Sequence, residues 1–306
     1  MYFDIIINPA ASSGRGRQNG RTVISALVME GVPFCVHAPK SEDELICTVR
    51  ALTTGLTEDR NLLIVGGDGT LSQVLNNIED FEHTVVSCIN SGSGSDFSRN
   101  IGIQRDIDHA IHKLVRKPEE ISLDYGIVRS DALPPRRFLI SSGVGYDADI
   151  CEEASRSRLK KALNIFRLGK LVYVFIGIKQ IFTRHCPSAL LYLDDAPPIR
   201  IGSLFFAVSM IHVYEGGGVP FCPHADPEDG LLDICLVKSM SKVKLLAAVA
   251  AVYFKLHTLF RNITCHRAKK VKIVTKVPQQ LHIDGETPAK VRLAEFECAG
   301  KLRILR

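Results

Sequence analysis

Short apolar runs alternate with helix-like stretches over the first 120 residues of the chain. Continuous apolar runs predict strands that are covered on both faces, and their alternation with helices predicts a parallel sheet. The expected strands are Phe3–Asn8, Phe34–His37, Leu62–Val65 and Val85–Ile89. The expected helices are Gln18–Met29, Glu42–Leu52, Leu71–Ile78 and Ile107–Arg116. Ligands of such sheets bind beyond the carboxyl ends of the strands.

After about Leu123 the pattern changes to strand-like segments separated by turns, with helical segments near 150–182 and 241–260. The strand-like segments are Arg137–Ser142, Ala189–Leu193, Ile199–Met210, Leu232–Val237, Lys270–Val274, Gln280–Ile283 and Lys290–Glu297. We therefore expect an α/β protein of two domains. Residues 1–123 with about 298–306 are predicted to form a doubly wound, mainly parallel α/β domain, and residues 124–297 a mostly antiparallel, β-rich domain.

Composition and charge exclude several classes of protein. The chain has 306 residues, 46% of them apolar and 23% charged, which is ordinary for a globular protein. The net charge of +5 is mild, and no basic and aromatic pattern indicates a nucleic-acid partner. Nine cysteines occur singly, without a CxxC motif, which predicts reduced thiols in a cytosolic protein. The N-terminus fits a strand better than a signal peptide. The apolar run Leu245–Phe254 is half as long as the ~20 residues of a membrane-spanning helix.

The stretch NLLIVGGDGTLSQVL places a single carboxylate, Asp68, among glycines directly after an expected strand. Gly66 and Gly67 allow a tight turn and a close approach to a ligand, and N–H groups at a helix start bind phosphate. A carboxylate repels phosphate unless a cation lies between them, so Asp68 indicates a magnesium-bridged nucleotide. The alternative is an Asp-Gly turn that only caps the helix opening at Thr70, and the spacing leaves both interpretations open. A P-loop is excluded, because its lysine motif is absent.

Five stretches together resemble one kinase superfamily. GGDGT at Gly66–Thr70 is similar to the signature of NAD kinases, phosphofructokinases and diacylglycerol kinases. The other stretches are INPAASSGRG at Ile7–Gly16, NSGSGSDFSRNIGI at Asn90–Ile103, EGGGVPFCPHADPEDGLLDI at Glu215–Ile234 and HIDGE at His282–Glu286. They follow the order of the family over nearly the whole chain, and NAD kinases do not carry the DGLLD and DGE pair. The chain therefore resembles the compact, bacterial-type lipid kinases of the diacylglycerol kinase family.

This resemblance implies a two-domain NAD kinase/diacylglycerol kinase fold and a catalytic role for three acidic residues. An ATP- and Mg²⁺-dependent kinase would transfer the γ-phosphoryl group to a lipid hydroxyl. Glu286 would be the general base, and Asp68 and Asp96 would belong to the metal and phosphate network. From the residues alone, Glu286 could instead be a solvated residue of an Asp-Gly turn. Asp96 could likewise be the N-cap of a helix that begins at Phe97.

The resemblance also implies the residues that bind nucleotide and a second metal. The implied nucleotide-binding residues are Asn8, Ser13, Gly14, Arg15, Gly66, Gly67, Asp68, Gly69, Thr70, Gly92, Ser93 and Ser95. Ser93 and Ser95 replace a threonine and an asparagine of the family, and serine cannot reproduce the paired donor and acceptor of an amide. Arg15 could equally lie in a solvated basic loop. A structural magnesium site is implied at Asp226, Asp229 and the Leu231 carbonyl, with a plain acidic turn as the alternative.

Diacylglycerol is the substrate that the resemblance favours, with phosphatidic acid as the product. Two alternatives stay open: a kinase for another lipid alcohol, such as a long-chain base, and a catalytically weak regulator that binds nucleotide or lipid. The expected partner is a lipid substrate at the membrane surface, contacted through the basic segment 155–184, whose alternative is a solvated helix face. We expect a cytoplasmic protein, peripheral on the inner face of the membrane, without a nucleic-acid partner. A homodimer remains open.

Overall fold

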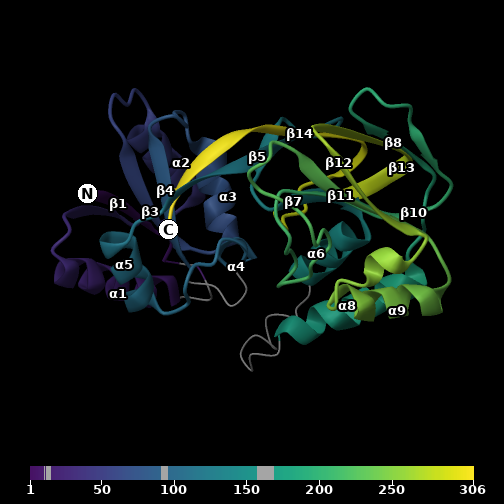
Figure 1. Ribbon diagram of the computed structural model, residues 1–306, viewed down its shortest axis with the longest axis horizontal. Helices are drawn as coiled ribbons and strands as arrows, with labels where there is room; N and C mark the ends of the chain where they lie inside the picture. Colours follow the sequence, from purple (N-terminus) through teal and green to yellow (C-terminus); the bar gives the residue numbers. More distant parts are fainter. Residues whose placement is uncertain (10, 12–14, 91–95, 157–168) are drawn as a thin grey trace. The chain divides into compact units, whose positions relative to one another are not determined.

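A computed structural model describes the chain except for residues 10, 12–14, 91–95 and 157–168. The chain divides into two compact units, Met1–Tyr125 with Gly300–Arg306, and Gly126–Ala299 (Figure 1). The C-terminal end of the chain therefore belongs to the N-terminal unit.

The first unit is a parallel sheet whose strands are followed by helices. Its elements are β1 (Phe3–Ile7), α1 (Arg15–Glu30), β2 (Phe34–His37), α2 (Glu42–Thr53), β3 (Arg60–Gly66), α3 (Asp68–Asn77), β4 (Thr84–Asn90), α4 (Asp96–Asn100) and α5 (Ile107–Arg116). The strand order is β4-β3-β1-β2, and each neighbouring pair is parallel. The carboxyl ends of β1, β3 and β4 are therefore level with one another, since Ile7 pairs with Val65 and Gly66 with Asn90.

Strands β1, β3 and β4 are buried almost throughout, which explains their largely apolar sequences, whereas β2 is partly exposed. One face packs against α1 and α5 in a single hydrophobic cluster. Its members include Phe3, Ile5, Leu63 and Val65 of the sheet, Val23 and Leu27 of α1 and Ile111 and Leu114 of α5. Side chains alternate along a strand, so Ile6, Leu62 and Ile64 point to the opposite face, where α2 and α3 lie (Figure 1).

The last strand, β14 (Lys290–Leu305), continues past Glu297, where the sequence pattern had predicted its end. Arg303 and Ile304 pair in parallel with β4, and the Ser87 hydroxyl of β4 donates to the Leu305 carbonyl at 2.9 Å. The charged residues Lys301 and Arg303 alternate with the buried Leu302 and Ile304 and hide this part of the strand in the sequence.

The second unit is mostly antiparallel. Its elements are the part of β5 (Glu120–Ser130) that follows Tyr125, β6 (Arg136–Phe138), β7 (Ser141–Gly145), α6 (Tyr146–Arg156), α8 (Gly169–Thr183), β8 (Ala189–Leu193), β9 (Ile199–Ile201), β10 (Leu204–Met210), β11 (Leu232–Lys238), α9 (Lys242–Val252), η2 (His257–Leu259), β12 (Ile263–Ala268), β13 (Lys270–Ile283) and most of β14. The strand order β12-β11-β10-β7-β13 is antiparallel throughout, and β13 also pairs with β14 and β8. The expected fold class, a parallel α/β part followed by an antiparallel β-rich part, is confirmed.

Several predicted strand limits in the second unit are wrong. Arg137–Ser142 is not one strand, because the Asp284 carboxylate accepts the N–H groups of Leu139, Ile140 and Ser141 at 2.8–3.2 Å and ends the ladder there. Ile199–Met210 is divided between β9 and β10. The two strands predicted within Lys270–Ile283 are one strand, with an irregular register between Val274 and Gln279. Strands β5 and β12 were not predicted, and helix α4 was predicted only within the alternative for Asp96.

Candidate active site

Three predicted nucleotide-binding residues meet at the carboxyl ends of β1 and β3. The Asn8 side-chain amide donates to the Thr70 hydroxyl at 2.9 Å. A Cβ on Gly66 would lie 2.7 Å from the Thr70 Cβ, so only glycine lets the first turn of α3 pack this closely on the end of β3. A Cβ on Gly16 would likewise collide with the Asn8 carbonyl, which holds the first turn of α1 against β1. Glycine at these two positions therefore allows the first turns of α1 and α3 to pack closely against the ends of the strands.

Asp68 is the first residue of α3, and its carboxylate joins α3 to α4. Its Oδ2 accepts the N–H of Asp96 at 2.9 Å, and its Oδ1 accepts the N–H of Phe97 at 3.3 Å. The side chain therefore caps α4, whereas Gly67, at the N-cap of α3, provides no side-chain hydrogen bond. The interpretation of Asp68 as a cap of its own helix is wrong, while its role in metal binding stays a prediction.

Asp96 is buried in the first turn of α4, next to Asp68. Its Oδ1 accepts a hydrogen bond from Arg99 at 2.8 Å. The N-cap alternative for Asp96 is therefore wrong, because the side chain pairs within the helix and Asp68 caps the helix start. Asp68 and Asp96 bring two carboxylates together, and oxygen ligands of this kind suit a magnesium ion.

Among the described residues, the glycine turn around Asp68 is open on its outer side. A Cβ added to Gly67 or Gly69 would meet no described atom within 4 Å, and Gly67, at the N-cap of α3, offers no side-chain cap to the first N–H groups of the helix. Such N–H groups favour a phosphate ligand. The remaining predicted nucleotide residues, Ser13, Gly14, Gly92, Ser93 and Ser95, lie outside the described residues. Arg15 begins α1, and its side chain also lies outside them.

Glu286, the predicted general base, follows a tight turn at the end of β13. Asp284 and Gly285 have φ of +48° and +84°, a conformation that favours glycine and, less often, aspartate. Glu286 and Ile283 exchange backbone hydrogen bonds of 2.8 and 2.9 Å across the turn. The Glu286 carboxylate, 42% exposed, is paired with Arg136 of β6 at 2.9 Å. The turn is thus held by Asp284, and the carboxylate of Glu286 is held by Arg136.

A buried ionic cluster lies directly before this turn. The Nε2 of His282 is 2.9 Å from a carboxylate oxygen of Asp147 and 3.6 Å from one of Glu215. All three residues are buried, and His282 is fully enclosed. Burial alone would lower the pKa of His282, but the charges of Glu215 and Asp147 outweigh it and raise the pKa to about 9. The cluster therefore holds an imidazolium between two carboxylates, and it ties β13 to α6 and to the loop after β10.

The predicted magnesium residues Asp226, Asp229 and Leu231 lie in one turn before β11. Asp226 accepts the N–H of Glu228 at 3.0 Å, and Asp229 accepts the N–H of Leu231 at 2.9 Å. Asp229 is also ion-paired with Arg267 of β12. The oxygen donors fit magnesium in type, but a guanidinium already faces one of them. Magnesium binding in this turn stays a prediction.

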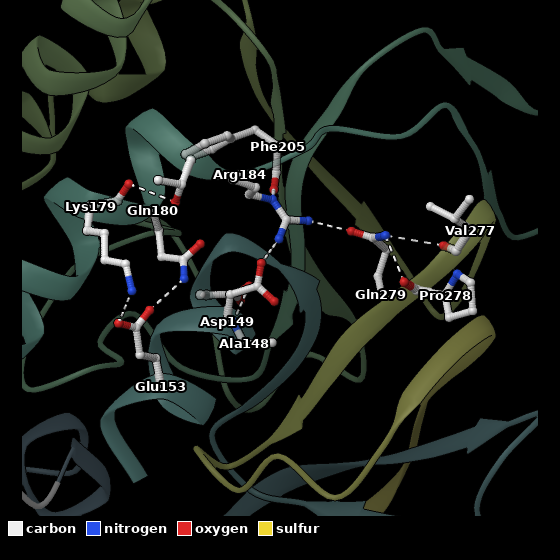
Figure 2. A network of polar contacts seen from close by, with 12 residues as sticks. Ala148, Asp149, Glu153, Lys179, Gln180, Arg184, Phe205, Val277, Pro278 and Gln279 are labelled. Carbon is white, nitrogen blue, oxygen red and sulfur yellow. Dashed lines mark hydrogen bonds and ion pairs between the residues drawn. The ribbon is translucent and has the colours of Figure 1, made fainter. Parts of the chain in front are cut away.

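Arg184, at the end of α8, anchors this helix to three other elements (Figure 2). Its guanidinium pairs with Asp149 of α6 and donates to the Phe205 carbonyl at 2.9 Å and to the Gln279 side chain at 2.5 Å. The side chain is only 4% exposed, and this burial lowers the pKa of the guanidinium. A charge this deeply buried is held by its partners, so Arg184 is not part of a basic membrane-facing surface.

Sequence reasoning missed the partners of the acidic residues. Glu215 and His282 lie in stretches on which the family resemblance rests, and Asp147 lies in none of them, so nothing local predicts that the three residues meet. Arg136 carries no signal that it would pair with Glu286, 150 positions along the chain. By contrast, Arg99 lies one helical turn after Asp96, and this spacing could have predicted their pairing.

Two family models together match nearly the whole chain. The diacylglycerol kinase catalytic domain matches residues 3–126, and the YegS C-terminal NAD kinase beta sandwich-like domain matches residues 140–306. The second model alone matches more than half of the chain.

Relatives and solved structures agree with these models. A Bacillus subtilis protein named as a candidate lipid kinase, YtlR, is 26% identical over 291 residues, which cover 93% of each chain. A diacylglycerol kinase of Mycobacterium tuberculosis is 25% identical over 269 residues, 88% of this chain and 83% of the relative. A crystal structure of a diacylglycerol kinase from Bacillus anthracis has a TM-score of 0.73 at 18% identity and covers 99% of this chain and 96% of that one. At that identity the structural likeness concerns the fold alone.

Proposed function

The chain belongs to the diacylglycerol kinase family of lipid kinases, which are phosphotransferases with an alcohol acceptor, and we propose that it phosphorylates diacylglycerol with ATP to give phosphatidic acid. The observation that carries this proposal is the hydrogen bond by which the Asp68 carboxylate, in its glycine turn, binds the first N–H group of α4. This arrangement gathers carboxylates and uncapped N–H groups at one edge of a parallel sheet, where ligands of such sheets bind.

The residues of this edge would orient the phosphates. When bound, ATP supplies the transferred phosphoryl group, and magnesium supplies positive charge that neutralises its oxygens. The N–H groups at the start of α3 would donate to phosphate oxygens, because Gly67 and Gly69 carry no side chain that would cover the backbone. Asp68 and Asp96 would hold the cation, and Arg99 would keep the Asp96 carboxylate in position.

Glu286 would take the proton of the lipid hydroxyl. A carboxylate suits this role because it needs only to accept a proton as the bond to phosphorus forms. Its ion pair with Arg136 fixes its orientation, and the Asp284 side chain fixes the turn that carries it. The buried cluster of His282 would position the end of β13 from which this turn starts.

We place the membrane contact on the helices of the second unit. Twelve of the eighteen exposed large apolar side chains among the described residues lie between Tyr173 and Leu259. They include Phe175 and Phe182 of α8, and Phe254 and Leu259 after α9, which are 57–79% exposed. Helices α8 and α9 are neighbours, since Lys242 of α9 bonds to the Ile181 carbonyl of α8. Exposed apolar groups concentrated in this way favour contact with a membrane.

The basic segment 155–184 contributes less charge to this contact than its composition predicts. Arg156 pairs with Glu152, Lys179 pairs with Glu153, and Arg184 is buried. Arg158, Lys160, Lys161 and Arg167 lie outside the described residues. No helix in the described ranges is both long and apolar enough to cross a bilayer. We propose a cytoplasmic protein that binds the inner face of the membrane reversibly, through apolar side chains aided by the remaining cations.

Vesicle binding tests this surface. Phe254→Ser with Leu259→Ser should weaken sedimentation with phosphatidylglycerol vesicles at least tenfold, and Val28→Ser with Met29→Ser, on an exposed part of α1, is the matched control. Equal binding of both double variants would place the contact elsewhere.

A substrate panel tests the function. ATP consumption should rise with diacylglycerol and stay at background with a long-chain base or with NAD. ATP consumption with the long-chain base alone would show that diacylglycerol is not the substrate. ATP binding without consumption in the presence of any acceptor would indicate a regulator.

A further inference from the structure

Three of the nine cysteines lie close together at the pairing of β11 with β12. Two of them are in these strands, and the third is in the loop that precedes β11. Cys235 of β11 is directly opposite Cys265 of β12 in the register of the two strands. Cys222 belongs to the same hydrophobic cluster as Cys235. The Cys265 sulfur lies 4.0 Å from the carbonyl oxygen of Phe221, the residue that precedes Cys222. Cys222 and Cys235 are buried, whereas Cys265 is exposed. The cluster therefore combines one solvent-accessible thiol, that of Cys265, with two buried thiols.

The backbone shows that Cys235 and Cys265 form a pair suited to a disulfide. The Lys238 N–H donates to the Asn262 carbonyl at 2.9 Å, so these two residues are a hydrogen-bonded pair. Such pairs alternate with non-hydrogen-bonded pairs along an antiparallel ladder, and Cys235 is three residues before Lys238. Cys235 and Cys265 are therefore a non-hydrogen-bonded pair, for which the Cα atoms are about 4.5 Å apart. This separation lies within the ~4.4–6.8 Å range that a disulfide requires.

The surroundings of Cys265 favour its thiolate. Hydrogen bonds from the Cys222 and Cys235 thiols, followed by the nearby His257 and His266, lower its pKa. The same hydrogen bonds, and then burial, raise the pKa of Cys222 and of Cys235, so these two remain thiols. Strand β12 is at the end of its sheet among the described residues, which leaves Cys265 open to small molecules. A low-pKa, accessible thiol beside a second cysteine is the arrangement of thiols that react with peroxide.

We propose that Cys265 is a peroxide-reactive thiol that closes a cross-strand disulfide with Cys235. In the first step the Cys265 thiolate attacks one oxygen of hydrogen peroxide. A sulfur–oxygen bond forms, the oxygen–oxygen bond breaks, and the departing hydroxide takes up a proton to become water. In the second step the Cys235 sulfur attacks the Cys265 sulfur. The Cys235 proton leaves with the hydroxyl of the sulfenic acid as water, and the disulfide forms. Two cysteines are oxidised, and one peroxide is reduced.

Peptide mass spectrometry of the reduced, full-length protein tests both steps. At pH ~6.5, where an ordinary thiol is mostly protonated, iodoacetamide should alkylate Cys265 at least tenfold faster than the exposed Cys35 and Cys47, which are matched controls in the same sample. After treatment with one equivalent of hydrogen peroxide, a Cys235–Cys265 linked peptide should appear and should vanish on reduction.

A variant isolates the first step. In Cys235→Ser, the sulfenic acid of Cys265 should persist and be trapped by dimedone, whereas the wild type should give little adduct because the disulfide forms. Alkylation of Cys265 no faster than that of Cys35 would overturn the proposal. A disulfide between Cys265 and Cys222 would overturn the assignment of Cys235 as the partner. The alkylation rates and the linked peptide are measured in the wild type, so they do not depend on whether the variant folds.

Discussion

The buried ion pair of His282 predicts how the stability of the protein depends on pH. The imidazole has a folded-state pKa of about 9 against an ordinary value of 6.5, so the folded protein binds a proton that the unfolded chain releases above pH 6.5. A folded-state pKa that is raised stabilises the fold fully below the unfolded pKa, and this contribution is lost as the pH rises through the folded pKa. Since one pKa unit corresponds to ~1.4 kcal/mol, the full contribution is roughly 3 kcal/mol.

The assay is urea unfolding followed by circular dichroism between pH ~6 and ~9.5, with thiols kept reduced. The comparison protein is the triple variant Asp147→Asn, Glu215→Gln and His282→Asn, which removes every charge of the cluster while keeping its shape. The free energy of unfolding of the wild type minus that of the variant should fall by roughly 3 kcal/mol over this range. About half of the fall should be complete near pH ~7.8, midway between the two pKa values.

Two results would refute the reasoning. A difference that stays constant with pH would mean that His282 does not change protonation on unfolding. A difference that grows with pH would mean that the histidine is neutral in the folded protein, as expected if burial outweighed its carboxylate partners. An NMR titration of the His282 imidazole in the wild type gives an independent midpoint, which we expect near pH ~9.

Other perturbations address single residues. Asp68→Asn should leave less than about a tenth of the wild-type turnover, because it removes a charge worth ~2.7–4 kcal/mol of barrier, and an unchanged melting temperature would show that the loss is chemical. Glu286→Gln should lower turnover at least ~10²-fold while the ATP dissociation constant, measured by calorimetry, stays within about twofold. Arg184→Met should destabilise the protein by roughly 3–5 kcal/mol in thermal unfolding, and adding Asp149→Asn should restore part of this, because the lone buried charge is then removed. Magnesium should raise the melting temperature of the wild type more than that of Asp229→Ala, and equal shifts would eliminate a metal site in that turn.

The sequence predicts the first unit well because β1, β3 and β4 are buried on both faces and are therefore largely apolar. It predicts the strands of the second unit less well, because many of them expose one face and carry polar or charged residues between their apolar ones. In β13, for example, the buried Gln279 accepts a hydrogen bond from Arg184, so a polar residue occupies a core position of the strand. The break between β6 and β7 could not be predicted either, because its cause is Asp284, far away along the chain.

The same distinction holds at the candidate site. The glycine turn with Asp68 is contiguous in the sequence, and its chemistry can be inferred from the order of its residues. The contact of Asp68 with α4 depends on the alignment of β3 with β4, which only the fold establishes. The cluster of His282, Asp147 and Glu215 depends in the same way on three separate elements, so the sequence alone does not predict that these residues meet.

The most direct test of the central proposal is mass spectrometry of a total lipid extract after incubation with the protein, ATP and magnesium. Diacylglycerol species should decline, and phosphatidic acids with the same acyl chains should appear in their place. Glu286→Gln, incubated in parallel, should leave the extract unchanged. A wild-type sample without any newly phosphorylated lipid, or a Glu286→Gln sample that matches the wild type, would contradict the proposal.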